Sequence, residues 1–110
     1  MPTVTLSSLI QSSYPTATTG TATINFGAHP GSNEASVVVN SQTGIQTTSV
    51  VDVEVRATAT STDHTADDHK YFPVFAGLTT SAPSAGTGFT IYARSTQKLT
   101  GTWTINWSWI

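Results

Sequence analysis

The chain of 110 residues contains no cysteine and has little charge. Without thiols, neither a disulfide framework nor a zinc–thiolate site can form. Charged side chains make up 9% of the sequence, compared with about 25% in an ordinary soluble domain. The four basic residues, Arg56, Lys70, Arg94 and Lys98, form no run. The basic patch that binds a phosphate backbone is missing, so we expect no nucleic-acid partner.

Long apolar runs are missing as well. No stretch approaches the roughly 20 residues needed to cross a bilayer, and residues 1–10 carry no Lys or Arg, unlike the start of a secretory signal. We therefore expect no membrane partner. The length fits one domain with a core that needs no metal or disulfide.

Hydroxyl side chains take the place of charge, with 22 Thr and 13 Ser among the 110 residues. Threonine is β-branched and suits a pleated sheet. A Thr and Ser surface stays hydrated but costs less to cover than one of Lys and Glu. It fits a protein that contacts neighbours, and equally a β domain with a threonine-coated solvent face.

Alternation of apolar and polar residues predicts strands throughout, and helical periodicity is nearly absent. In the first part of the chain the predicted strands are 21–26, 35–39 and 51–60, the last being the longest. In that strand Asp52, Glu54 and Arg56 share one face, which predicts a salt-bridged outer surface.

The C-terminal segment carries the clearest strand pattern. Residues 89–94 and 102–109 alternate, and 95–98 is the predicted turn of a terminal hairpin. One face of the last strand predicts core packing and consists of Trp103, Ile105, Trp107 and Trp109. The opposite face is a low-charge surface that a neighbour could cover and consists of Thr102, Thr104, Asn106 and Ser108.

Between these strands the pattern is less regular. Residues 61–70 predict a loop or helical turn capped by Thr62 or Asp63. Residues 71–75 predict an edge strand or irregular segment because Pro73 has no N–H to donate to a β-ladder.

Together these features predict an all-β fold, an antiparallel β-sandwich or jelly-roll-like barrel of about six to eight strands with little helix. Residues 1–19 are expected to form an N-terminal arm or first edge strand, and residues 20–110 the β-sandwich domain.

Residues 63–69 hold two of the three histidines and three of the six acids. The candidate metal ligands are His64, Asp67, Asp68 and His69, because imidazole and carboxylate suit zinc or another divalent ion. His64 and Asp68 would meet on one face of a helical turn. The spacing matches no established motif, so we favour a capped turn with solvated acids and predict no metal or cofactor.

Catalytic patterns are not evident in the sequence. It contains no Gly-x-Ser-x-Gly elbow, and Asp52 and Glu54 stand beside Arg56 rather than as an isolated acid pair. We therefore predict no catalytic residue and no enzyme activity. Aromatic side chains leave glycan stacking open as an alternative, and the candidates are Tyr71, Phe72, Tyr92 and the three tryptophans.

The overall character of the chain, which is Cys-free, Thr-rich and poor in charge, resembles that of a known class of proteins. The segments that contribute to this resemblance are Tyr71–Phe75, Gly86–Ile91 and Leu99–Trp107. The chain resembles the small β-rich accessory virion proteins of tailed bacteriophages, especially capsid decoration or cement proteins. The resemblance implies a structural virion protein, assembled in the host cytoplasm, that stabilises contacts between shell subunits. It also implies a major capsid or tail protein as partner, and a homo-oligomer such as a trimer or ring. The alternatives are a carbohydrate-binding or tail/baseplate accessory module and a metal-binding module at residues 63–69.

Overall fold

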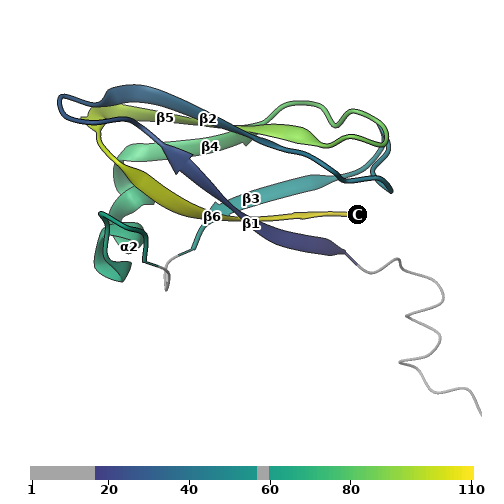
Figure 1. Ribbon diagram of the computed structural model, residues 1–110, viewed down its shortest axis with the longest axis horizontal. Coiled ribbons are helices and arrows are strands. Elements are labelled where there is room, and N and C mark those ends of the chain that lie inside the picture. Colours follow the sequence, from purple (N-terminus) through teal and green to yellow (C-terminus); the bar gives the residue numbers. More distant parts are fainter. Residues whose placement is uncertain (1–16, 57–59) are drawn as a thin grey trace, which may run out of the picture.

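The computed structural model describes residues 17–56 and 60–110, which form a sandwich of two antiparallel three-stranded sheets (Figure 1). The strand orders are β1-β6-β3 in one sheet and β2-β5-β4 in the other. The elements are β1 (Thr18–Asn25), β2 (Ser32–Val39), β3 (Val51–Val55), α2 (Ala66–Phe75), β4 (Ala76–Thr80), β5 (Phe89–Leu99) and β6 (Thr102–Trp109). The predicted all-β sandwich is confirmed, and its six described strands fall within the predicted range.

The core lies between the two sheets and is centred on β5 and β6. Ile105 of β6 and Ile91 of β5 are fully buried, and Trp103 and Trp107 are 4% and 9% exposed. Trp109 is partly buried against the same cluster. The tryptophan face of the last strand therefore packs inward as predicted. The other buried apolar residues are Ile24, Phe26, Val39, Ile45, Phe72, Phe89 and Ala93.

The predicted C-terminal hairpin is wrong. β5 continues through residues 95–98, where a turn was expected, and ends at Leu99. The chain then crosses at Thr100 and Gly101 to the other sheet, so that β5 and β6 are the central strands of different sheets (Figure 1). Both strands present an apolar face, and placing one above the other buries both faces in one core.

The predicted strand over 51–60 also differs from the structure. β3 ends at Val55, residues 57–59 lie outside the described residues, and β5 is the longest described strand, with 11 residues. β1 begins at Thr18, so residues 18 and 19 belong to the sandwich. Residues 1–16 of the predicted N-terminal arm lie outside the described residues.

Residues 71–75 form the second half of helix α2, where an edge strand or irregular segment was predicted. Thr65 is the N-cap, so the predicted caps Thr62 and Asp63 are wrong. Phe72 and His69 lie on one face of the helix and are buried, which anchors the helix even though Pro73 lacks an N–H. Among the residues that the structure describes, no helix combines the length and apolar character of a membrane span.

Candidate functional site

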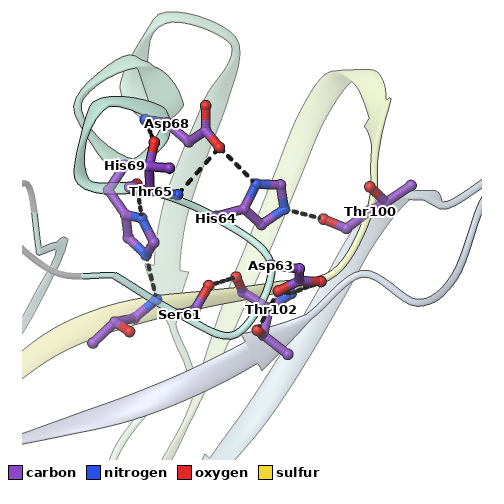
Figure 2. A network of polar contacts seen from close by, with 9 residues as sticks. Ser61, Asp63, His64, Thr65, Asp68, His69, Thr100 and Thr102 are labelled. Atoms are coloured by element: carbon purple, nitrogen blue, oxygen red, sulfur yellow. Dashed lines mark hydrogen bonds and ion pairs between the residues drawn. The ribbon is translucent and has the colours of Figure 1, made fainter.

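The cluster of histidines and acids lies where residues 61–65 and the start of α2 cover the beginning of β6 (Figure 2). Asp63, His64 and His69 each reach a backbone group near the start of that strand. These three contacts attach the helix and its preceding loop to the sheet at three points. We call this arrangement the helix clamp.

Asp63 is the first contact of the helix clamp. Its carboxylate accepts hydrogen bonds from the Thr102 N–H at 3.0 Å and from the Thr102 hydroxyl at 2.7 Å. Gly101, with φ +73°, makes this approach possible: a Cβ there would overlap the Asp63 carboxylate. The Thr102 hydroxyl bond, followed by the backbone bond, lowers the pKa of Asp63.

His64 is the second contact. Its Nε2 donates to the Thr100 carbonyl at 2.6 Å, and its Nδ1 lies 3.2 Å from Asp68 Oδ2. The predicted meeting of His64 and Asp68 is thus confirmed, although His64 precedes the helix. The contact with His64 lowers the pKa of Asp68, and the Thr65 N–H bond lowers it further.

Asp68 also helps to cap the N-terminus of helix α2. Its backbone N–H donates to Thr65 Oγ1 at 3.2 Å, and its carboxylate accepts from the Thr65 N–H at 3.3 Å. This reciprocal pair is a capping box, which satisfies two backbone donors and places negative charge at the positive end of the helix. The Thr65-x-x-Asp68 spacing was the sequence signal that could have located the helix start.

His69 is the third contact and is fully buried. Its Nε2 accepts from the Thr104 N–H at 2.9 Å, and its Nδ1 donates to the Thr65 carbonyl at 2.8 Å. A backbone N–H can only donate and a carbonyl can only accept, so these partners assign the neutral ring with its proton on Nδ1.

Trp103 joins the helix clamp to the core. The His64 ring stacks on its indole with centroids 3.8 Å apart and planes at 20°, while His69 and Phe72 pack against it at 5.2 and 5.1 Å. Each of these three side chains comes from the loop or from α2. One indole thus packs against both the sheet core and the covering helix.

The four candidate metal ligands are distributed over these contacts. His64, Asp68 and His69 face one another or backbone groups, and Asp67 pairs with Lys70 at 3.2 Å on an exposed surface. Within residues 17–56 and 60–110, no three His, Asp or Glu side chains are grouped to hold a metal ion. All four ring nitrogens of His64 and His69 take part in polar contacts, and the Nε2 atom of each ring bonds to a backbone group at or near the start of β6.

Thr102 and Thr104 were expected on a surface open to neighbours. In the structure both are half-buried: the Thr102 N–H and hydroxyl bond to Asp63, and the Thr104 N–H bonds to His69. Asn106 and Ser108 line a shallow groove on the outer face of the same sheet. The covering role of the loop was not evident from sequence, because alternation assigns a residue to a face but does not identify what packs on it.

That groove has a volume of about 780 Å³ and is flanked by Asp52 and Glu54 on β3 and by Arg56 directly after it. The predicted salt bridges on this strand do not form: the ion pairs among the described residues join His64 to Asp68, Lys70 to Asp67, and Arg94 to Glu34. The outer face therefore presents hydroxyl, amide and single charged groups.

The two exposed tyrosines lie on different elements. Tyr71 is on α2 and 63% exposed, and Tyr92 is on β5 and 44% exposed. Tyr92 lines a groove together with Glu34 and Arg94, and Tyr71 is not part of that groove. They do not form the row of aromatics that a sugar-stacking platform uses.

Comparison with known proteins finds no matching family model, no similar curated protein and no similar solved structure. The interpretation of the helix clamp and of the sheet surfaces therefore depends on the contacts described above.

The lowered pKa values of Asp63 and Asp68 predict acid sensitivity. A carboxyl whose pKa is lower in the folded than in the unfolded chain stabilises the fold above the unfolded value of about 4. This stabilisation is lost as the pH falls through the folded value. We expect Tm to fall on acidification from pH 6 towards about pH 2, and to fall less steeply in Asp63→Asn.

Calorimetry at a series of pH values measures this difference. Asp52→Asn, an exposed change on β3, is the matched control and should follow the native curve. Parallel curves for the native protein and Asp63→Asn would contradict the assigned role of Asp63.

Proposed function

We propose that this protein is a structural virion protein of a bacteriophage, most simply a capsid decoration protein that stabilises contacts between shell subunits. The observation that carries the proposal is that the His and Asp cluster has a structural role. Both ring nitrogens of His64 and of His69 are engaged in the helix clamp: His64 contacts Asp68 and the Thr100 carbonyl, and His69 bonds to two backbone groups. A protein that works by contact needs a rigid shape rather than a reactive group.

The sheet surfaces support the same proposal. On the outer face of β1-β6-β3, aligned positions carry Thr19, Ser108 and Asp52 in one row, and Thr21, Asn106 and Glu54 in the next. Of these six residues, four carry a short hydroxyl or amide group and two carry a charge. Such groups lose less solvation on contact than long charged side chains. The resemblance to phage accessory proteins points to a shell as the surface contacted.

The test is reconstitution on particles of the phage that encodes the chain. Particles that lack the protein are incubated with purified, labelled protein and banded on a density gradient, and the bound label is counted per particle. We expect saturable binding and greater resistance of the particles to heat. Binding to isolated tails but not to heads would favour the tail/baseplate alternative, and no binding to either would overturn the proposal.

A pair of variants makes this experiment specific. Asn106→Arg places a long charge in the groove on the outer face of β6, whereas Thr79→Arg places the same charge on an exposed position of β4 in the other sheet. If the β1-β6-β3 face contacts the shell, Asn106→Arg should lower bound protein at least about tenfold, and Thr79→Arg should leave it unchanged.

A further inference from the structure

Within the described residues, β1 is an edge strand that carries none of the charge, proline or bulges that commonly keep an edge strand from pairing with another chain. Proteins protect sheet edges by keeping them short, by adding charge or proline, and by interrupting them with bulges. β1 has eight residues with the sequence TTGTATIN, which contains no charge and no proline. Its register with β6 is continuous from Thr18 to Asn25.

The other three edge strands each carry such protection. β2 contains Glu34 and a register shift between Ser32 and Glu34. β3 has five residues, including Asp52 and Glu54, and β4 also has five. Among the described strands at sheet edges, β1 is thus both the longest regular one and free of charge.

The backbone groups that β1 turns outward follow from the ladder. The Phe26 N–H donates to the Gly101 carbonyl at 2.9 Å, just beyond the end of β1. Hydrogen-bonded pairs alternate along an antiparallel ladder, so Ile24, Ala22 and Gly20 bond to β6. Thr19, Thr21 and Thr23 then direct their N–H and C=O groups to the open edge, where no described strand pairs with them.

The side chains of β1 also leave this edge open. Thr19, Thr21 and Thr23 are exposed on the outer face of the sheet. Gly20 and Ala22 lie at the inward-facing positions of β1 and are small. A second backbone can therefore approach the edge without meeting a bulky side chain. Glycine is required at position 20 for a separate reason, because a Cβ there would overlap the indole of Trp107.

We infer that β1 pairs with β1 of a second copy of this chain, antiparallel and about a two-fold axis at Thr21. The strand is self-complementary in this register. Thr21 lies opposite its own copy and Thr19 lies opposite Thr23, giving threonine pairs on the outer face. Gly20 lies opposite Ala22 on the inner face. About six backbone hydrogen bonds join the two strands.

The pairing joins two three-stranded sheets into one sheet of order β3-β6-β1-β1-β6-β3. It places the outer faces of both copies side by side, and so doubles the polar surface that the proposed function assigns to contact with a shell. The inferred partner in assembly is a second copy of the chain, and in this respect the inference rests on the proposed function. It predicts a two-fold pair, in contrast to the trimer or ring that the resemblance implies.

The first test measures association of the full-length purified protein without particles, by sedimentation equilibrium from about 5 to 500 μM. We expect a reversible monomer–dimer equilibrium. Thr21→Lys places two like charges opposite each other on the axis and should raise the dimer Kd at least about tenfold. Thr79→Lys, the same change on the uncharged edge strand β4, should leave Kd unchanged. Mixing Thr21→Lys with Thr21→Glu should restore association as a heterodimer.

The second test uses the absence of cysteine in the chain. Thr21→Cys introduces the one thiol, and directly opposed residues of an antiparallel pair are close enough for a disulfide. Mild oxidation should convert Thr21→Cys to a covalent dimer, and Thr79→Cys should stay mostly monomeric.

A protein that stays monomeric at about 500 μM, or a dimer that Thr21→Lys does not weaken, would overturn the inference. Circular dichroism establishes that each variant is folded; should Thr21→Lys be unfolded, the Thr21→Cys crosslink decides the question alone. Because these measurements involve no particles, failure of strand pairing leaves the particle-binding result untouched, and the reverse also holds.

Discussion

Replacing Trp103 by alanine should cost about 3–5 kcal/mol of the free energy of unfolding, the typical loss for a buried tryptophan. Trp103 is 4% exposed and belongs to the core cluster while also contacting the helix clamp. His64 stacks on one of its faces, and His69 and Phe72 pack around it. The variant therefore leaves a cavity in the core and removes the surface on which the helix clamp rests.

Urea unfolding followed by circular dichroism measures this loss. Tyr71→Ala on α2 is the control, since its side chain is 63% exposed and should change the free energy by less than about 0.5 kcal/mol. Equal effects of the two variants would contradict the placement of Trp103 at the junction between helix and core.

The second large effect is expected for His69→Leu. Leucine fills much of the same buried space but cannot accept the hydrogen bond from the Thr104 N–H. An unsatisfied buried donor costs about 1–3 kcal/mol, and the altered fit against Trp103 adds to this, so we expect a total of about 3 kcal/mol. The loss differs in origin from that of Trp103→Ala, since it removes a polar contact rather than apolar volume.

Hydrogen exchange of the Thr104 amide gives the specific readout. In the native protein this amide is bonded to His69 Nε2 and should exchange slowly, and in His69→Leu it should exchange faster than the amides of the core strand β5. Asp67→Ala is the control, because its 81%-exposed side chain contacts Lys70 and not the sheet. Slow exchange at Thr104 in His69→Leu would contradict the assigned hydrogen bond.

Both predictions concern the attachment of α2, the element that was hardest to foresee. Pro73 and the apolar run Tyr71–Phe75 suggested an extended segment, because local propensity alone disfavours proline inside a helix. The helix forms there because the Thr65–Asp68 capping box starts it and Phe72 is buried in the core. Tertiary burial thus outweighed the local preference, as is common for short helices.

The role of the histidines was likewise decided by contacts between distant segments. The meeting of His64 with Asp68 follows from their spacing and was predicted. The bonds from Asp63, His64 and His69 to Thr102, Thr100 and Thr104 join residues 35 to 39 positions apart, and no local pattern encodes such partners. For this reason a possible metal cluster in the sequence became a helix clamp in the structure.

The sequence by itself determined the all-β class and the inward face of the last strand, because alternation with a period of two is a local property of the chain. It also determined the low-charge surface, since composition alone sets it. The tertiary structure decided that β5 and β6 lie in different sheets, that α2 is attached at the start of β6, and that β1 is an edge strand among the described elements. Each of these depends on which apolar faces can be buried against one another, and that is settled by the packing of the whole domain.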